Sequence, residues 1–394
     1  MPAPPDRAAL LTPDAPAEVV ELLRRLDVLA ERARREREGL EAFESALAGA
    51  DASPMLAGHA TPEATRRLAA RLGRDASGFY RPAQGLVVSS LGVGTNRGAA
   101  DDETDAGYAR AVHAACRGGI NLVDTALNYR RQRSERAVGA GLRVFIRDGG
   151  ARDEVVLCTK GGYLVPGAFS ERTLSDRALD ELHCMAPAFL EDQIARSRRN
   201  LGVETIDVYY LHNPETELRS LAAPLFMRRI RAAFAALERT VADGLVRFYG
   251  AATWDGLRTG ALSLRDLADA AREVAGERHH FRFVQLPFNL GMQEALRRRP
   301  GGEGSLVDVA AELGITVVTS ASLAHARLLD EQSAELRDRL LALPTDAVRA
   351  IQFARSAPGI ASALVGMRQA AHVAENLAVA RVPPLTSDDY AWAS

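Results

Sequence analysis

The chain has 394 residues, of which 47% are hydrophobic and 25% charged, and a formal net charge of −2. A chain of this length and composition can bury one large core or two modest ones, as globular proteins do. Its nearly balanced charge gives no reason to expect nucleic acid or an anionic membrane as a partner.

The cysteines and the N-terminus indicate the cellular compartment. The three cysteines, Cys116, Cys158 and Cys184, form an odd and scattered set, which is typical of a reducing compartment. Residues 1–6 lack the basic region and apolar core of a secretory signal. No window approaches the run of about eighteen apolar residues that a membrane span needs. We therefore expect a cytoplasmic protein.

The first part of the chain reads as an extension, residues 1–75, placed before a main domain at 76–394. Residues 1–16 are rich in Pro, Ala and Asp and predict a poorly ordered start. Residues 17–50 carry an apolar stripe at helical spacing, which predicts a helix. The stripe consists of Val20, Leu23, Leu26, Leu29 and Ala33. This helix either forms a homo-oligomer or packs on the outside of the main domain. A second helix is expected from Pro62, after the hydroxyl cap Thr61, to Leu72.

The main domain begins with a predicted β-hairpin, in which 79–81 and 86–88 flank a turn at 82–85. Short, nearly continuous apolar runs follow, as in strands that are buried on both faces. They lie at 91–94, 120–123, 155–158, 206–211, 246–251, 283–286, 315–318 and 360–365. Helical patterns separate them, among others at 105–117, 135–146, 188–201, 226–243, 306–313 and 346–356.

This alternation predicts an α/β fold, a (β/α)₈ TIM barrel that is capped by the N-terminal β-hairpin and preceded by the helical extension. A doubly wound sheet is the alternative. It would need a glycine-rich dinucleotide fingerprint after the first strand. Residues 92–94 read Gly-Val-Gly, lack the third glycine and lead into a loop, so the barrel is favoured.

In such a barrel, polar residues at the carboxyl ends of the strands face the active site. In strand order these residues are Thr95, Asn96, Asp124, Tyr129, Lys160, His212, Asn213, Thr253, Trp254, Gln285, Asn289, Ser320, Ser322, Gly366 and Arg368. Taken singly, an aspartate here is commonly a helix cap, a lysine a rim charge and a histidine a buried structural residue. Here, however, three successive strand ends carry an acid, a phenol, a lysine and a histidine. This combination indicates that the four side chains act together in one functional site.

The chemistry of this group follows from its residue types. Lys160 beside the Tyr129 hydroxyl is expected to lower the pKa of the phenol, and Asp124 to keep the lysine charged. Tyr129 then becomes a usable proton donor. His212 is expected to bind and orient the substrate oxygen. We find no nucleophile, and no metal site is predicted because the histidines and cysteines are dispersed. These features predict carbonyl reduction with a hydride from a cofactor.

Residues from about 79 to 381 resemble the aldo-keto reductase family. The motifs that carry the resemblance lie at 91–95, 121–129, 156–160, 207–212, 285–289 and 366–376. The resemblance implies the catalytic residues Asp124, Tyr129, Lys160 and His212. It also implies NAD(P)(H)-dependent interconversion of aldehydes or ketones with alcohols.

The resemblance further places the cofactor across the carboxyl-terminal rim. The implied cofactor-binding residues are Gly94, Thr95, Asn96, Asp124, Thr253, Gln285, Ser320, Ser322, Leu323, Gly366, Arg368, His372, Glu375 and Asn376. Arg368 suits a 2′-phosphate, which predicts NADP(H) rather than NAD(H), and Gln285 is expected to hold the nicotinamide carboxamide. The chain departs from the family at Thr253, where many relatives carry asparagine, at 319–323, which lacks an aromatic ring, and at His372, where glutamine is common. Trp254 and Phe288 are candidates to replace that ring.

The substrate pocket is expected to be built from loops, with Tyr163, Asn213 and Trp254 as its lining. The longest insertion spans 161–187 and mixes polar and apolar residues. A sugar, a polyketide-like ketone and a small aldehyde all remain compatible with it. Two other functions stay open: a nicotinamide-binding regulatory barrel, and a redox-neutral reaction of the epimerase or dehydratase type.

Overall fold

The computed structural model describes residues 54–73, 78–165, 183–298, 304–323, 340, 342–386 and 390. The chain divides into two compact units, Met1–Pro54 and Met55–Ser394. The predictions for the poorly ordered start and for the helix at 17–50 lie outside the described residues, and the boundary between residues 75 and 76 stays a prediction. No helix in the described part is long and apolar enough to cross a membrane.

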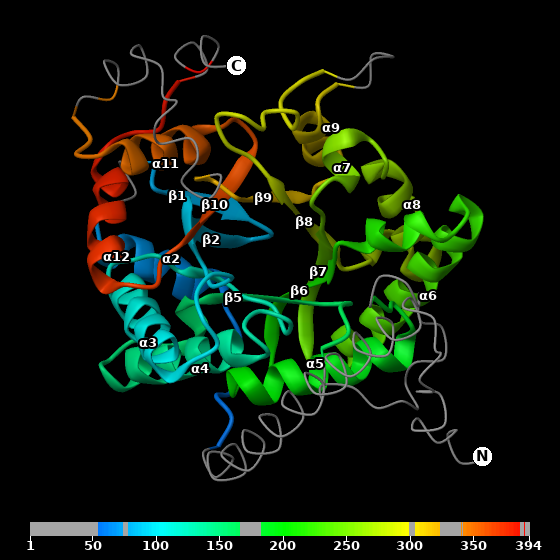
Figure 1. The fold of residues 1–394 in the computed structure, drawn as a ribbon, viewed down its shortest axis with the longest axis horizontal. Helices are drawn as coiled ribbons and strands as arrows, with labels where there is room; N and C mark the ends of the chain where they lie inside the picture. Colours follow the sequence, from blue (N-terminus) through cyan, green and yellow to red (C-terminus); the bar gives the residue numbers. More distant parts are fainter. Residues whose placement is uncertain are drawn as a thin grey trace, which may run out of the picture. The chain divides into compact units, whose positions relative to one another are not determined.

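The second unit is built on a closed barrel of parallel strands (Figure 1). In the order in which they pair around the barrel, the strands are β3 (Leu91–Gly94), β4 (Leu122–Asp124), β5 (Val156–Gly161), β6 (Ile206–His212), β7 (Val246–Ala252), β8 (Phe281–Pro287), β9 (Thr316–Ser320) and β10 (Ile360–Gly366), which pairs with β3. This architecture confirms the predicted (β/α)₈ barrel and excludes the doubly wound sheet.

The strands are buried on both faces, as their continuous apolar sequence predicts. On β5, for example, Val156 and Cys158 belong to a cluster inside the barrel, whereas Leu157 joins the core between the strands and the helices. Because side chains alternate along β5, Lys160 also points to the inside of the barrel. On β6 the inward-pointing side chains are Val208, Tyr210 and His212. Strand register therefore decides which side chains reach the centre of the barrel.

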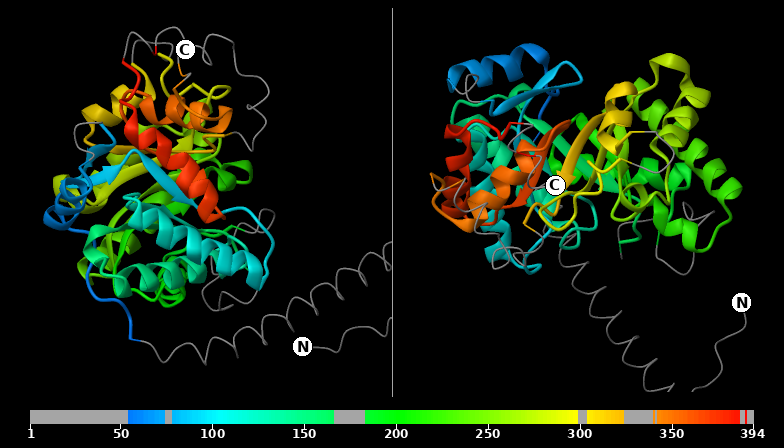
Figure 2. Two further views of the ribbon diagram at one scale, coloured as in Figure 1. Left: turned by 90° about the vertical axis from the view of Figure 1, so that its left-hand side faces the viewer. Right: turned by 90° about the horizontal axis from the view of Figure 1, so that it is seen from above.

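Helices surround the strands (Figures 1 and 2). They are α3 (Asp102–Arg117), α4 (Arg133–Arg147), α5 (Pro187–Leu201), α6 (Ala223–Ala242), α7 (Gly256–Thr259), α8 (Leu264–Ala275), α9 (Leu306–Glu312), α11 (Asp346–Ser356) and α12 (Ala370–Asn376). Short 3₁₀ segments connect them: η3 (Arg152–Glu154), η5 (Pro214–Arg219), η6 (Gly276–Arg278) and η8 (Leu377–Arg381). Several helices begin about where the sequence predicts. Helix α3, for instance, starts at Asp102 because the carboxylate of Asp101 accepts from the N–H of Thr104 at 2.8 Å.

The predicted hairpin closes the amino-terminal end of the barrel. Strands β1 (Tyr80–Ala83) and β2 (Leu86–Ser89) pair antiparallel around Gln84 and Gly85, which both have positive φ. Gln84 donates to the carbonyl of Gly314, just before β9, at 2.8 Å. Asn121, just before β4, accepts from the N–H of Ser89 at 2.7 Å. The opposite end of the barrel is thus the open one.

Helix α2 (Pro62–Arg71) also packs at the hairpin, and both appear in blue in Figure 2. Its cap is the one predicted, since the Thr61 hydroxyl accepts from the N–H of Ala64 at 3.1 Å. Just before this cap, the N–H of Ala60 donates to the buried carboxylate of Asp207 on β6 at 2.6 Å. Asp207 also accepts from Arg152 at 2.8 Å. The Asp207 carboxylate therefore connects the segment before α2 to strand β6 of the barrel by a hydrogen bond.

Candidate active site

A cavity of about 760 Å³ opens at the carboxyl ends of the strands. The predicted site residues that line it are Gly94, Thr95, Asn96, Asp124, Tyr129, Tyr163, His212, Asn213, Thr253, Trp254, Gln285, Ser320, Ser322, Leu323 and Gly366. Lys160 lies beneath this lining, 1% exposed. Four predicted cofactor residues on or near α12 do not line the cavity: Arg368, His372, Glu375 and Asn376.

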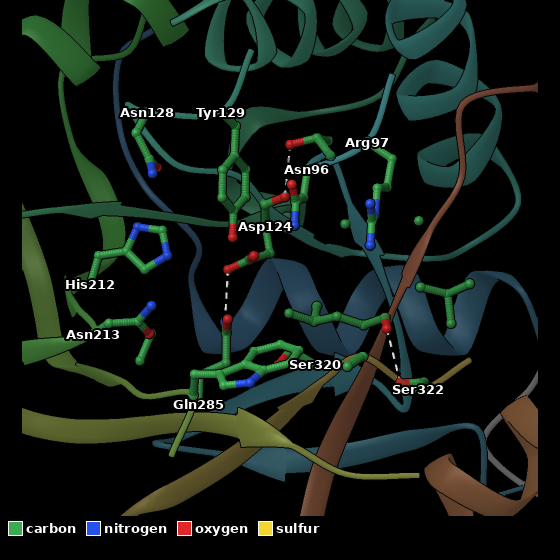
Figure 3. A pocket seen from close by; sticks show the side chains of 18 of the residues that line it. Asn96, Arg97, Asp124, Asn128, Tyr129, His212, Asn213, Gln285, Ser320 and Ser322 are labelled. Atoms are coloured by element: carbon green, nitrogen blue, oxygen red, sulfur yellow. Dashed lines mark hydrogen bonds between the residues drawn. The ribbon is translucent and has the colours of Figure 1, made fainter. Parts of the chain in front are cut away.

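Asp124, Lys160 and Tyr129 form a chain of contacts at the bottom of the cavity; Asp124 and Tyr129 are labelled in Figure 3. Asp124 is the last residue of β4, and Lys160 on the neighbouring β5 donates to its carboxylate. The Nζ atom of Lys160 lies 3.4 Å from the hydroxyl oxygen of Tyr129. It lies 4.9 Å from the centre of the tyrosine ring. The ammonium group is thus placed to stabilise a negative charge on the phenol oxygen.

Burial and the neighbouring charges oppose each other in setting the pKa values of these three groups. Burial alone would lower the pKa of Lys160, but Asp124 and then Tyr129 raise it above its ordinary value, so the lysine stays charged as predicted. Burial also raises the pKa of Asp124, and Lys160 opposes that rise. For Tyr129, burial raises the pKa more than Lys160 lowers it. Lys160 thus acts on the pKa of Tyr129 in the predicted direction, but burial outweighs it and the net pKa is raised.

Tyr129 sits on a constrained turn between β4 and α4. The three residues after it, Arg130, Arg131 and Gln132, all have positive φ, at 49°, 56° and 71°. Such conformations cost side-chain-bearing residues free energy, so other contacts must hold them. Arg130 is buried and donates to the carbonyl of Ala99 at 2.7 Å and to the carboxylate of Asp105. These contacts anchor the turn of Tyr129 to the loop between β3 and α3.

His212 ends β6 and faces Tyr129 across the cavity (Figure 3). The two rings meet edge to face, with their centres 5.6 Å apart. Burial, followed by Lys160 and His183, holds the pKa of His212 well below its usual value. Its Nδ1 atom is buried and has no hydrogen-bond partner among the described residues. The ring is therefore a neutral imidazole, which can donate one hydrogen bond into the cavity.

The substrate side of the cavity combines polar groups with a tryptophan. Asn213 has a left-handed conformation, and its amide donates to the Tyr163 hydroxyl at 3.0 Å. Trp254 is 39% exposed at the rim. One carboxylate oxygen of Glu215 accepts from the backbone N–H of Trp254 at 2.7 Å, and Asp255 and Gly256 reach the same oxygen. The predicted lining residues thus lie together, and Glu215 fixes the backbone that carries the indole.

Several predicted cofactor residues already have partners. The amide nitrogen of Gln285 donates to Asp124 at 2.9 Å, so its expected role toward the nicotinamide stays a prediction. The hydroxyl of Ser322 donates to the carbonyl of Leu364 at 2.9 Å. Glu375 accepts from Thr345 at 2.6 Å. Gly366 differs, because no atom lies within 4 Å of the position that a Cβ would take.

Phe288 is not at the cavity. It is fully buried and stacks on Phe353, with ring centres 5.9 Å apart and planes 6° apart. This stack belongs to the core beside β8, and it removes Phe288 as a replacement for the missing aromatic ring. Of the two candidates, only Trp254 lines the cavity.

Comparison with known proteins identifies the family. The model of the aldo/keto reductase family matches residues 90–339. The chain belongs to this family. It is an oxidoreductase of the aldo/keto reductase type, in agreement with the sequence prediction.

Two characterised proteins and one solved structure are informative relatives. The chain is 28% identical to a 6-dehydroglucose reductase of Novosphingobium aromaticivorans, over 78% of this chain and 91% of that protein. It is 31% identical to a D-threo-aldose 1-dehydrogenase of Pseudomonas sp, over 43% of this chain and 51% of that protein. A Klebsiella pneumoniae aldo-keto reductase, solved in complex with NADPH, aligns with a TM-score of 0.59 at 21% identity, covering 80% of this chain and 94% of that one. This last likeness concerns the fold.

The aldo/keto reductase cavity also contains residues that the sequence prediction missed. They are Arg97, Asn128, Arg130, Ala252, Ala321, Leu364 and Val365. Arg97 directly follows Asn96, and Asn128 directly precedes Tyr129, so adjacency to predicted residues was the available signal. Arg97 brings a positive charge to the lining (Figure 3). In the described part of the chain, no three His, Cys, Asp or Glu side chains gather as a metal site would require.

Proposed function

We propose that this protein is an NADP(H)-dependent oxidoreductase that interconverts a carbonyl group with an alcohol on a small hydroxylated substrate of the sugar class. The observation that carries the proposal is the contact of 3.4 Å between Lys160 Nζ and the Tyr129 hydroxyl, with Asp124 bound to the same lysine at the bottom of the cavity. A proton donor and a cation, without a nucleophile, suit carbonyl reduction.

The cavity fits a nicotinamide cofactor. A volume of about 760 Å³ is in the range of small-molecule sites and leaves space for a substrate beside the nicotinamide. The space beside Gly366 admits a bulky group close to the backbone, and the cation of Arg97 suits a phosphate. Gln285, Thr253 and Ser320 would surround the nicotinamide end. NADPH, when bound, supplies the hydride that reduces the carbonyl carbon.

The residues of the chain would move the proton and hold the substrate. As hydride reaches the carbonyl carbon, negative charge develops on the oxygen, and the Tyr129 O–H donates its proton there to complete the alcohol. Lys160 stabilises the phenolate that this transfer leaves, and Asp124 fixes the lysine. The neutral His212 ring donates a hydrogen bond to the same carbonyl oxygen and so orients it.

The substrate class rests on the polarity of the cavity and on the relatives. Asn96, Asn213 and Tyr163 present amides and a hydroxyl, which match the hydroxyl groups of a sugar. The exposed indole of Trp254 provides an apolar face beside them. The names of two relatives, a 6-dehydroglucose reductase and a D-threo-aldose 1-dehydrogenase, support the same class. We further propose a reducing compartment, the cytoplasm, which is supported by the three buried cysteines, since none of them forms a disulfide in the described part of the chain.

The test is a steady-state assay of the purified full chain that follows the absorbance of the reduced nicotinamide. NADPH and NADH are compared with a panel of sugar carbonyls, simple ketones and simple aldehydes, and NADP⁺ with aldoses. We expect turnover with NADPH, with the highest kcat/KM on hydroxylated substrates and with kcat lower by roughly 10²- to 10⁴-fold in the Tyr129→Phe variant. NADPH binding without turnover on any carbonyl or alcohol contradicts the proposal. A sugar that is converted without net oxidation of NADPH would instead indicate the redox-neutral alternative.

A further inference from the structure

A second histidine lies directly behind His212. His183 is fully buried, and its Nε2 atom is 2.8 Å from the backbone carbonyl oxygen of His212. Its Nδ1 atom is 3.0 Å from a carboxylate oxygen of Glu217, which is also fully buried. The other carboxylate oxygen of Glu217 accepts from Arg229 on α6 at 2.9 Å. Three buried or half-buried ionisable groups thus meet behind the catalytic strand end.

The hydrogen bonds determine the proton positions. A carbonyl oxygen can only accept, so Nε2 of His183 must donate to His212. Glu217 also accepts from Arg229, a cation that favours its ionised form. With Glu217 ionised, Nδ1 of His183 donates to it, both ring nitrogens carry protons and the ring is an imidazolium, which is the form that the inference below assigns. A buried cation of this kind needs a paired anion, and Glu217 supplies it.

The His183 ring also supports the substrate side of the cavity. Its centre lies 5.1 Å from that of Tyr163, edge to face, and Tyr163 in turn lies 5.0 Å from the His212 ring. A Cβ on Gly162 would come within 2.6 Å of His183 Nε2, so only glycine lets the chain pass here. The groups that face His183 are therefore Glu217, the His212 carbonyl and ring, and the Tyr163 ring.

We propose that His183 is a positioning residue, whose Glu217-bound imidazolium holds the His212 carbonyl and the Tyr163 ring so that both side chains face the reacting carbonyl. The inference rests on the proposed function for its kinetic consequence. Its structural part concerns contacts within the chain. After His212 the backbone leaves the strand and turns left-handed at Asn213, with φ of 51°. Fixing the carbonyl immediately before that turn sets the direction of both side chains. A misplaced catalytic group loses rate even when it is still present.

The charge of His183 also acts on His212 through space. Together with burial and Lys160, it holds the pKa of His212 low and the ring neutral. Removal of the cation at His183 therefore raises the pKa of His212. A residue that merely fills space would not have this effect, so this shift separates positioning by the imidazolium from general packing.

The experiment compares His183→Leu and His183→Gln with the wild-type enzyme, and uses His279→Gln as the matched control. His279 is also buried, but it precedes β8 at the opposite end of the barrel. We expect His183→Leu to lower kcat/KM by roughly ten- to hundredfold while the NADPH dissociation constant stays within about twofold. We expect His183→Gln, which keeps a donor for the His212 carbonyl, to recover part of kcat. The control should match the wild type.

A second readout needs no turnover. The ring signal of His212, assigned by its loss in His212→Asn, is followed by NMR as the pH changes. We expect its pKa to rise in both His183 variants. Unchanged kinetics in His183→Leu, or an unshifted His212 titration in the folded His183→Gln variant, would overturn the proposal. Absence of turnover in the wild-type enzyme would instead contradict the proposed function, and the NMR titration would still decide the role of His183.

Discussion

Lys160 and Tyr129 come from consecutive strand ends, and the ammonium nitrogen of the first lies 3.4 Å from the hydroxyl oxygen of the second. Lys160 and Asp124 are buried and Tyr129 is half-buried, so the lysine has one fixed anion and one neutral neighbour. The phenol therefore holds its proton at neutral pH. In the proposed reaction, this relationship makes Tyr129 the proton donor, and Lys160 stabilises the phenol oxygen when the proton leaves.

Replacement of Tyr129 by phenylalanine removes the donor and leaves the ring. General acid catalysis contributes roughly 10²- to 10⁴-fold, so kcat is expected to fall by about that factor. Cofactor affinity should change little, because only a hydroxyl group is lost from the cavity. Single-turnover kinetics and a fluorescence titration with NADPH measure the two quantities. Retention of wild-type kcat in Tyr129→Phe would remove this residue as proton donor.

The pH dependence of reduction follows from the two shifted groups. Tyr129 must be protonated to donate, and burial raises its pKa above the ordinary value of 10.0. His212 must be neutral, and its pKa lies well below the ordinary value of 6.5. Because loss of the tyrosine proton occurs only above its pKa, and protonation of the histidine only below its own, kcat/KM should be flat between about pH 6.5 and pH 10. The measurement uses a substrate without titratable groups. An inflection inside this range that disappears in Tyr129→Phe would contradict the assignment.

Two arginines are expected to contribute differently to the cofactor. Arg97 lines the cavity, so Arg97→Gln should weaken NADPH and NADH alike, by roughly ten- to hundredfold for a charge-assisted contact. Arg368 is exposed beside α12, and Arg368→Gln should weaken NADPH alone if it contacts the 2′-phosphate. Calorimetric titration with both cofactors distinguishes these outcomes. Arg231→Gln, which changes an outer residue of α6 paired with Glu273, serves as control. Equal effects of Arg368→Gln on both cofactors would exclude a 2′-phosphate contact.

The carboxylate of Asp207 is expected to matter for stability rather than for chemistry. It accepts from Ala60, Leu157 and Arg152 in a fully buried position. Asp207→Asn leaves the buried cation of Arg152 without its carboxylate, although Arg152 still donates to the carbonyls of Val155 and Thr205. The loss of this anion should lower the free energy of unfolding by on the order of 3–5 kcal/mol. Denaturant unfolding measures this, and Glu273→Gln at an exposed ion pair should have little effect. If Asp207→Asn has the same free energy of unfolding as the wild type, the Asp207 carboxylate does not stabilise the fold as its contacts indicate.

Local sequence predicted the fold because the relevant signals are local. The buried strands are continuous apolar runs, and several helices carry a side-chain cap, as at Thr61 and Asp101. The site followed from the same pattern, because parallel strands bring their carboxyl ends together. Asp124, Lys160 and His212 could thus be assembled from their positions at strand ends.

The remaining features depend on groups that are distant in the sequence. The net rise in the pKa of Tyr129 comes from burial, which is a property of the whole fold and outweighs the nearby lysine. The bond from Gln285 to Asp124 joins residues 161 positions apart.

Contacts between residues that are distant in the sequence also explain the other differences between the predicted and the observed site. Phe288 does not replace the missing aromatic ring beside the cofactor, because it packs against Phe353 in the core. The hydrogen bond from His183 to the His212 carbonyl joins residues that lie 29 positions apart in the sequence. The sequence by itself determined which side chains reach the open end of the barrel, because strand periodicity is local. Only the tertiary structure decided their partners and their protonation, because desolvation and hydrogen bonding depend on what the fold places around them.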